Sequence, residues 1–286
     1  MNDRISVHIC TKDRHTELAI LLHSLKNQTL QDFDIVILDD ASGHEPLCAK
    51  FVQDIVQRLR LDGHGVKFIR NNISYGVCKA RNQLLEEDPW KENTNFVCRL
   101  DDDVILEPDF LRQLWLAMFE TENVGITSGV TPLLSGPDFK RETKFVKPII
   151  NELKFDEFGE LTKIGDDCGY SYLTEDVIPT HHFRSNALIK RKLIDDGIRY
   201  PDGYSQVGFR EELNFSIQAI LAGYSIYVNT QAKALHGVCG SGGCRYPNYS
   251  QLVQSDELIM RKWMKMLYLK HGDFLKEYTK EYGGLE

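Results

Sequence analysis

The sequence lacks a long hydrophobic run: no segment of its 286 residues approaches the ~20 consecutive apolar residues that a membrane-spanning helix needs. The start, MNDRISVHICTKDR, has an apolar run too short for a secretory signal, and charged residues follow at once. Basic residues are outnumbered, with 34 Lys and Arg against 42 Asp and Glu and a formal net charge of −8. This balance argues against nucleic-acid binding, although a local basic site could still bind a phosphorylated small molecule.

Cysteine is too sparse and too irregularly spaced for a disulfide framework. The count of seven is odd, which suits a reduced, cytoplasmic protein. Cys239 and Cys244 flank a Gly-Ser-Gly-Gly stretch and could form half of a zinc site, but no second Cys/His pair has finger-like spacing. The full set is Cys10, Cys48, Cys78, Cys98, Cys168, Cys239 and Cys244.

Two glycine-rich nucleotide-binding motifs are also absent. No GxGxxG follows the first apolar run, which weighs against a dinucleotide fold, and no GxxxxGK[ST] occurs. Another kind of group must therefore hold any nucleotide. A carboxylate can accept hydrogen bonds from a base or a ribose, or it can bind a divalent cation that grips a diphosphate.

The pattern that is present alternates strand and helix signals. Short apolar runs at 5–10, 33–40, 66–71 and 95–100 predict strands, and periodic stretches at 18–25, 51–59 and 77–87 predict helices between them. Another helix opens at 107–109. This alternation predicts an α/β fold: a single Rossmann-like domain whose central mixed, mostly parallel sheet is flanked by helices.

The second half of the chain has a looser pattern. We expect a strand near 124–134, an inserted hairpin or loop region over 135–180, a helix over 211–224 and a strand over 225–237. A Gly-rich stretch and a helical tail over 250–282 follow. The predicted organisation is a domain over 1–237 and a C-terminal helical extension, with its Gly-rich loop, over 238–286.

Polar residues follow each of the four predicted strands. They occupy 11–14, 39–42, 71–72 and 101–103, and the carboxyl ends of parallel strands meet at one edge of a sheet, where ligands bind. The last group, in CRLDDDVILEPDF, has three adjacent acids that would repel by roughly 4 kcal/mol per pair at ~4 Å. A solvated turn would relieve this repulsion, and so would Mg²⁺ or Mn²⁺ shared with a diphosphate. The convergence of four polar ends favours the cation.

Four stretches carry a family resemblance: SVHICTKDRHTELAILLHSLKNQTLQDFDIVILDDAS, NNISYGVCKARN, FVCRLDDDVILEPDFL and GFREELNFSIQAILAGYSIYVNTQAKALHG. In this order, over about residues 4–237, they resemble a family 2 glycosyltransferase with the GT-A fold. The resemblance implies a metal-dependent, inverting transfer of a sugar from a nucleoside diphosphate, most often UDP, to a hydroxyl group. It also implies Mn²⁺ or Mg²⁺ as cofactor.

The resemblance assigns the nucleotide to the first three strand ends. It implies that Asp39 accepts a hydrogen bond from the uracil N–H, and that a segment around Arg81 closes over the nucleotide. Alternatives remain open: Asp40 and Ser42 could form a helix N-cap or an Asx turn, and Arg81 could be a surface charge. The implied nucleotide-binding residues are Thr11, Asp13, Arg14, Asp39, Asn71, Gly76 and Arg81.

The acidic triplet then corresponds to the family's DxD motif. Asp103 would contact the metal, Asp101 would face the ribose or a metal-bound water, and Asp102 would lie on the sugar side. His236 follows the last predicted strand, where the family often has a third ligand to the metal or the diphosphate. A lone histidine is more often structural, so that alternative stays open.

The family places its catalytic base in an acidic pair, often Glu-Asp, at the start of a helix. This chain has Glu211-Glu212, so Glu212 occupies the position of the base and Glu211 remains a second candidate. Acids in a first helical turn also stabilise the helix dipole, which is the structural alternative. The region 181–186 is expected to border the acceptor or to be structural.

The tail RKWMKMLYLK mixes basic and apolar residues. It could dock at the inner face of the membrane near a lipid-linked acceptor, or it could pack on the domain, which is the more common arrangement. The expected partners are a nucleotide sugar and a saccharide, lipid-linked or protein acceptor. Two other functions stay open: an inactive nucleotide-sugar-binding protein, and a sugar-nucleotide nucleotidyltransferase, although CTKDRH lacks the Gly-rich loop that such enzymes usually have.

Overall fold

The first half of the chain forms the parallel part of the sheet. The computed structural model describes residues 4–120, 122–136, 140–141, 149–165, 172–173 and 177–281. Strands β1 (Ile5–Thr11), β2 (Phe33–Asp39), β3 (Val66–Arg70) and β4 (Phe96–Leu100) lie side by side in the order β4-β1-β2-β3, all parallel. Every residue of β2 is buried, as expected for a parallel strand covered on both faces. All four predicted strands are therefore present.

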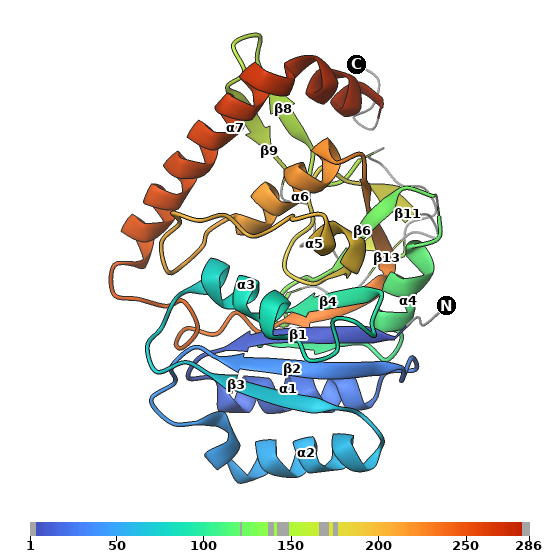
Figure 1. Ribbon diagram of the computed structural model, residues 1–286, viewed down its shortest axis with the longest axis vertical. Coiled ribbons are helices and arrows are strands. Elements are labelled where there is room, and N and C mark those ends of the chain that lie inside the picture. Colours follow the sequence, from blue (N-terminus) through green and yellow to red (C-terminus); the bar gives the residue numbers. More distant parts are fainter. Residues whose placement is uncertain are drawn as a thin grey trace.

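Helices cover both faces of this parallel part (Figure 1). On one face, α1 (His15–Lys26) packs on α2 (Lys50–Leu61), which follows a short 3₁₀ turn, η1 (Pro46–Cys48). On the other face, α3 (Val77–Glu87) lies over β1 and β2. The three helices match the predicted ones because their apolar residues recur at the spacing of one helical face.

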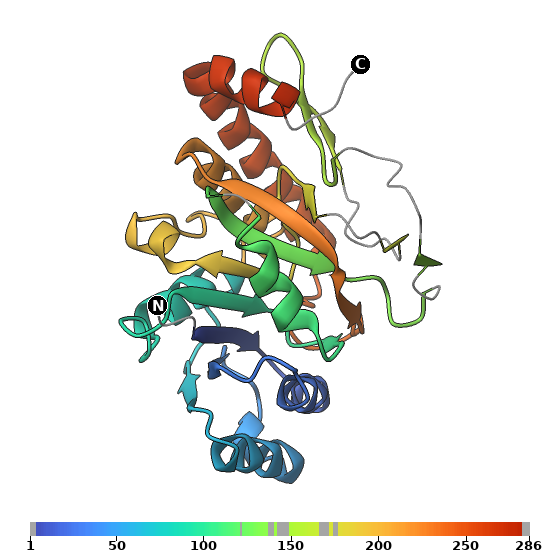
Figure 2. The same cartoon turned by 90° about the vertical axis from the view of Figure 1, so that its right-hand side faces the viewer.

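The second half of the chain extends the same sheet with mixed pairing. Its strands are β6 (Val124–Val130), β11 (Val177–Pro179), β12 (Ala187–Lys190) and β13 (Ser225–His236), giving the order β11-β13-β6-β12-β4. Strand β12 runs antiparallel to both β4 and β6, while β13 runs parallel to β6. Figure 2 shows the long orange strand β13 beside the green strand β6. The predicted mixed α/β sheet is confirmed.

Shorter elements complete the second half. Strand β5 (Val104–Leu106) pairs with the end of β13, and α4 (Phe110–Ala117), α5 (Arg191–Asp195) and α6 (Glu211–Leu221) flank the sheet. Two small ribbons lie apart from it: β8 (Leu153–Phe155) with β9 (Leu161–Ile164), and β7 (Lys140–Arg141) with β10 (Tyr172–Leu173). The predicted inserted hairpin region thus contains β8–β9, and part of it lies outside the described residues.

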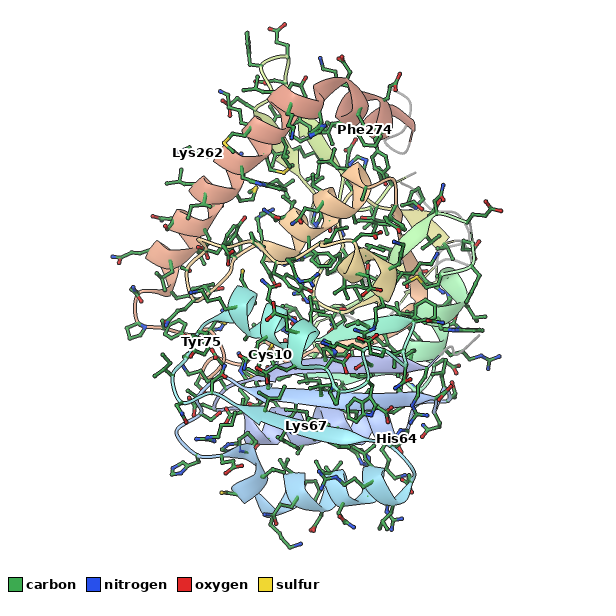
Figure 3. All side chains as sticks on the ribbon, in the orientation of Figure 1. Cys10, His64, Lys67, Tyr75, Lys262 and Phe274 are labelled. Atoms are coloured by element: carbon green, nitrogen blue, oxygen red, sulfur yellow. The ribbon has the colours of Figure 1, made fainter. Side chains whose placement is uncertain are left out.

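The tail helix α7 (Tyr249–Glu281) packs one face on the domain. Met260, Met264 and Leu275 are buried, and His271, with φ −130°, kinks the helix. Figure 3 labels Lys262 and Phe274 along this helix. In Figure 1 the helix runs diagonally past α6. This face of α7 therefore packs on the domain, which is one of the two arrangements expected for the tail. None of the helices in the described part of the chain combines the length and apolar character needed to cross a bilayer.

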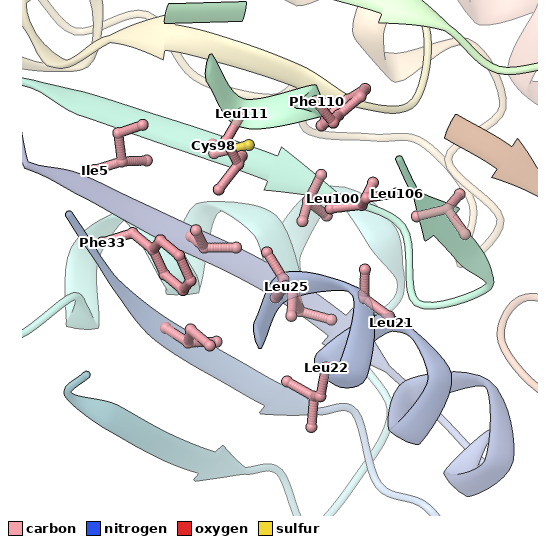
Figure 4. Close-up of a cluster of buried hydrophobic side chains, with 14 of the residues drawn as sticks. Ile5, Leu21, Leu22, Leu25, Phe33, Cys98, Leu100, Leu106, Phe110 and Leu111 are labelled. Carbon is pink, nitrogen blue, oxygen red and sulfur yellow. The ribbon is translucent and has the colours of Figure 1, made fainter. Parts of the chain in front are cut away.

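The largest hydrophobic cluster lies between the parallel strands and the helices α1, α2 and α4. Leu21, Leu22 and Leu25 of α1 face the strands and belong to one cluster with Ile5 of β1 and Phe33 of β2 (Figure 4), and all five are fully buried. A second cluster joins α6 and α7 to the other face of the sheet. The two clusters hold the strand ends rigidly, which sets the positions of the polar residues that follow them.

One buried acid ties α7 to the loop before α6. Asp256 is fully buried, and its carboxylate accepts hydrogen bonds from the N–H of Ser205 (2.6 Å), the hydroxyl of Ser205 (2.8 Å) and the N–H of Phe209 (2.9 Å). Its neighbour Glu257 is more exposed and pairs only with Arg261 among the described residues. The loop that leads into α6 is therefore positioned by the tail.

We expect Asp256→Ala to destabilise the fold, because each buried donor left without a partner costs roughly 1–3 kcal/mol. Urea unfolding measures the change. Glu257→Ala is the matched control, since an exposed ion pair contributes only about 0–1 kcal/mol. Equal losses of unfolding free energy in both variants would contradict the anchoring role of Asp256.

Candidate active site

A polar cavity of about 370 Å³ opens at the carboxyl ends of the parallel strands. The ends of β1 and β4, the start of α3, the start of α6 and the segment 237–248, here called the connector, all contribute to its wall. Cys10, near the end of β1, lines it (Figure 3). Its volume lies in the range of small-molecule sites, roughly 300–1,000 Å³. The polar residues after β1, β2 and β4 therefore line one pocket as predicted, whereas Asn71 and Asn72 after β3 are not among its lining residues.

The acidic triplet lies in this cavity, and basic side chains offset its repulsion. Arg81 Nη2 lies 2.7 Å from Asp101 Oδ1. Arg14 Nη1 bridges Asp102 Oδ1 at 2.8 Å and Asp103 Oδ2 at 2.9 Å. The chain therefore supplies a third source of relief beside solvent and a metal, because each carboxylate has an arginine partner. The structure also excludes the surface-charge interpretation of Arg81, which is buried.

The three carboxyl groups differ in acidity. Burial would raise the pKa of Asp101, but the charges of Arg81 and Arg99 hold it well below its usual range. Burial raises the pKa of Asp102 to about 6 against the charge of Arg14. Burial would raise the pKa of Asp103, but the hydrogen bond with His236 and the charges of Arg14 and His236 together lower it. Asp101 and Asp103 are therefore anions at neutral pH, and Asp102 is the easiest to protonate.

His236 lies at the end of β13 beside Asp103. Its Nε2 is 3.2 Å from Asp103 Oδ1. Burial would lower the pKa of His236, but the hydrogen bond and charge of Asp103 raise it. The structure thus brings together two residues that are 133 positions apart in the chain.

The second strand end organises the loop before α3. Asp40 Oδ1 accepts hydrogen bonds from Asn71 Nδ2 (3.0 Å) and Tyr75 N–H (2.9 Å). Asp40 Oδ2 accepts from the Ser74 hydroxyl (2.7 Å) and Gly76 N–H (3.0 Å). Gly76 has φ +83°, and a Cβ there would lie 2.5 Å from a backbone atom of Gln206, so only glycine fits. Asp40, which the sequence left as a cap or turn, shapes this wall of the cavity.

Asp39 and Asp13 lie outside the residues that line the cavity. Asp39 accepts the Ser42 N–H at 2.9 Å, closing a turn, and pairs with Arg70 at 2.6 Å. The helix N-cap interpretation of Asp40 and Ser42 is wrong, because the next α-helix begins only at Lys50. Asp13, whose φ is +53°, accepts the Gly43 N–H at 2.7 Å. Thr11, buried and paired in register with Asp39, does line the cavity.

The predicted acidic pair enters the cavity from the first turn of α6. Glu211 is buried, and its Oε1 lies 2.7 Å from Arg99 Nη2 and 3.2 Å from Arg81 Nε. Glu212 is only partly buried and also lines the cavity. The two acids therefore differ, because Glu211 is anchored by arginines whereas Glu212 has no ion pair within 4 Å in the described chain.

The comparison with family models decides the assignment. The model of glycosyl transferase family 2 matches residues 6–195, more than half of the chain. The chain belongs to glycosyl transferase family 2. No curated protein sequence matches it.

Two solved structures share the fold. Residues 1–349 of S. aureus TarS align with a TM-score of 0.56 at 18% identity, covering 82% of this chain and 60% of that one. The crystal structure of GalNAc-T7 with UDP, GalNAc and Mn²⁺ aligns with a TM-score of 0.61 at 16% identity, covering 88% and 47%. This chain thus spans about half to three fifths of the chains that it matches. The likeness confirms the predicted GT-A fold.

The two glutamates at the start of α6 interact, and their pKa values shift in opposite directions. Burial and the Glu212 charge raise the pKa of Glu211 to about 8, against the charge of Arg99. Burial alone would also raise the pKa of Glu212, but the hydrogen bond from Glu211 and the charges of Arg99 and Arg184 lower it. At neutral pH the pair therefore shares one proton, which Glu211 holds, and Glu212 is the carboxylate.

The side chains of the triplet and of His236 could supply some of the ligands of a divalent-cation site. Among the described residues, no group of three or more His, Cys, Asp and Glu side chains is arranged to hold a metal unaided. Mg²⁺ and Mn²⁺ sites often use one or two protein ligands and take the rest from substrate phosphates and water. Asp103 Oδ1 and His236 Nε2, 3.2 Å apart, match that smaller share.

Several residues of the cavity could not be anticipated from the sequence pattern. Arg99 stands inside β4 as a charged interruption of an apolar strand, yet it is buried against Glu211. The connector crosses the triplet: Gly243 N–H donates to the Lys12 carbonyl at 2.7 Å, and Arg14 Nε donates to the Ser241 carbonyl at 3.2 Å. The Gly-rich composition of the connector signalled a close approach but not its target.

The two adjacent histidines behave differently. His181 is buried and its Nδ1 accepts the Leu153 N–H at 2.8 Å, away from the cavity. His182, also buried, does line the cavity, and its Nε2 lies 3.0 Å from the Gly165 carbonyl. Region 181–186 thus borders the cavity through His182, Arg184 and Ser185.

Proposed function

We propose that the protein is a metal-dependent, inverting glycosyltransferase that moves a sugar from a nucleoside diphosphate, most often UDP, to a hydroxyl of a saccharide, lipid-linked glycan or protein acceptor. One observation carries this proposal: the acidic triplet and the Glu211–Glu212 pair line the same cavity, at the carboxyl edge of a GT-A sheet. Family membership supports the reaction class, and the UDP and Mn²⁺ that accompany GalNAc-T7 in its crystal structure support the kind of donor and cofactor.

The donor side of the cavity is built by the ends of β1, β4 and β13. Asp103 and His236 would hold Mn²⁺ or Mg²⁺, which would neutralise charge that develops on the leaving diphosphate. Asp101, fixed by Arg81, would accept a hydrogen bond from the ribose or from a metal-bound water. Thr11 and the loop that Asp40 holds at Gly76 would border the nucleotide, and Asp13, Asp39 and Asn71 would support that border.

The acceptor side is built by the start of α6. Glu212 would remove the proton of the acceptor hydroxyl as its oxygen attacks the anomeric carbon, and direct in-line attack inverts the configuration there. Glu211, held by Arg81 and Arg99, would position Glu212 through the shared proton. We assign the role of the base to Glu212 and not to Glu211 because two arginines hold the Glu211 side chain in place.

Two alternatives are separated by experiment. A sugar-nucleotide nucleotidyltransferase is disfavoured by family 2 membership. An inactive binding protein would bind UDP in calorimetry but turn over no donor. We therefore expect slow donor hydrolysis, measured as released UDP across a panel of nucleotide sugars, with Mn²⁺ present and with EDTA. Absence of hydrolysis with every donor, together with UDP binding, would favour the binding protein.

The shared proton predicts a pH dependence. Because the pKa of Glu211 is about 8, turnover is expected to decline above pH 8, where both carboxyl groups are charged and repel each other. The acid limb should lie below the ordinary glutamate range, because the pKa of Glu212 is lowered. Glu211→Gln keeps a hydrogen-bond donor without a titration, so its rate should not decline near pH 8. An unchanged alkaline limb in Glu211→Gln would contradict this assignment.

The proposal also covers the cellular location of the protein and its contact with a membrane. We place it in the cytoplasm, where its six described cysteines would remain free thiols. A peripheral contact with the inner face of the membrane would use the outer face of α7, where Leu258, Met266 and Leu269 are exposed.

A further inference from the structure

The cavity wall has more cationic side chains than form ion pairs with its carboxylates. Arg14, Arg81 and Arg99 each pair with a carboxylate of the triplet or with Glu211. Four further cationic residues line the cavity: Lys12, Arg184, Arg210 and Arg245. In the described parts of the chain, Lys12, Arg210 and Arg245 have no carboxylate within 4 Å. In a protein with a net charge of −8, this local surplus points to an anionic ligand.

Arg210 is the residue directly before the acidic pair, and its backbone is strained. It has φ 64° and ψ 30°, a left-handed conformation that arginine adopts far less readily than glycine. The chain nevertheless has a long cationic side chain here. Such an outlier beside candidate catalytic residues makes Arg210 itself a candidate functional residue.

The Arg210 side chain enters the cavity from the N-terminal end of α6. Its Nε is buried and has no hydrogen-bond acceptor within the described residues. The guanidinium lies over the Phe209 ring, 5.1 Å from the centroid, which fixes its direction. Glu212 and Glu257 are the acids whose charges reach it, and neither is within ion-pair distance. A planar guanidinium of this kind binds phosphate or carboxylate through two parallel hydrogen bonds.

Arg184 adds a second positive charge at the same place. It lines the same cavity from the segment before β12. Burial is the main cause of the lowered pKa of Arg210, with Arg184 opposing its charge further. Arg184 and Arg210 therefore belong to the wall of one cavity, although they come from different segments of the chain.

We propose that Arg210 and Arg184 bind an anionic group, a phosphate or a carboxylate, that the acceptor carries close to its reacting hydroxyl. The inference rests on the proposed function and narrows its acceptor class. The anion is assigned to the acceptor because Arg210 adjoins Glu212 on α6. The diphosphate side, by contrast, is formed by Arg14, Asp103 and His236 from other elements.

The test uses three matched probes: glycerol 3-phosphate, glycerate and neutral glycerol. Each is titrated by calorimetry into the full chain, with and without saturating UDP and Mn²⁺. We expect the anionic probes, but not glycerol, to bind in both conditions, and Arg210→Gln to weaken them about tenfold or more. Arg210→Lys should recover part of the affinity. Arg112→Gln, which removes an exposed arginine of α4, is the control and should change nothing.

Separate readouts distinguish the possible failures. The UDP affinity of Arg210→Gln should stay within twofold of the wild type; a larger loss would assign Arg210 to the donor diphosphate and overturn the inference. Equal probe binding in Arg210→Gln and wild type would also overturn it. Selective loss of UDP-glucuronate hydrolysis relative to UDP-glucose, with probe binding intact, would assign the anion to the transferred sugar instead. Failure of the proposed function would appear independently, as absent UDP binding and absent donor hydrolysis.

Discussion

Replacing Glu212 with glutamine is expected to lower the turnover number by roughly 10²–10⁴-fold, the range that a positioned general base contributes. The physical reason is that glutamine keeps the shape of the side chain but cannot accept the proton of the acceptor hydroxyl. Nucleotide binding should be unaffected, because Glu212 enters from α6 and the donor side is formed by β1, β4 and β13. The measurement is a steady-state assay of transfer, with UDP affinity from calorimetry.

Glu211→Gln is the matched control for this variant. Its Oε1 faces Arg99 and Arg81, and a glutamine oxygen can still accept those hydrogen bonds. We therefore expect a smaller loss at neutral pH, within about tenfold, because only the positioning of Glu212 is weakened. If Glu211→Gln abolished turnover and Glu212→Gln retained it, the roles of the two glutamates would be reversed.

Replacing Asp103 with asparagine is expected to reduce turnover by roughly 10²–10³-fold, the scale seen when one electrostatic contact to developing charge is lost. Asp103 is the proposed cation ligand, and it also holds Arg14 at 2.9 Å and His236 at 3.2 Å. Asparagine retains one carbonyl oxygen but removes the negative charge. The readout is donor hydrolysis as a function of Mn²⁺ concentration, where the half-saturating concentration should rise.

Asp109→Asn provides the control for the loss of a nearby acid. Asp109 is exposed and accepts a hydrogen bond from the Thr29 hydroxyl, outside the cavity. It should leave the Mn²⁺ response unchanged. A thermal unfolding curve for Asp103→Asn separates a local defect from misfolding. If Asp103→Asn had the same Mn²⁺ dependence as the wild type, the assignment of the triplet as a metal-binding DxD motif would be wrong.

Much of the parallel sheet could be predicted from local pattern. The run 33–40 is apolar because both faces of β2 are covered, so burial alone marks it, whereas β3 at the edge of the sheet is recognised by its short run of Val66, Phe68 and Ile69. Strand β12 escaped prediction because Ala187–Lys190 is short and its antiparallel pairing with β4 and β6 depends on distant partners. Strand β5 escaped for the same reason, since its partner is the end of β13.

The sequence by itself determined the elements that carry the site: four strands that end in polar residues, three adjacent acids, and an acidic pair at a helix start. These follow from periodicity and composition, which are local. Only the tertiary structure decided the roles of the partners. It buried Arg99 against Glu211, turned Asp40 toward Gly76, and placed the connector over Arg14. Charge pairing and burial depend on residues far apart in the chain, so no local pattern records them.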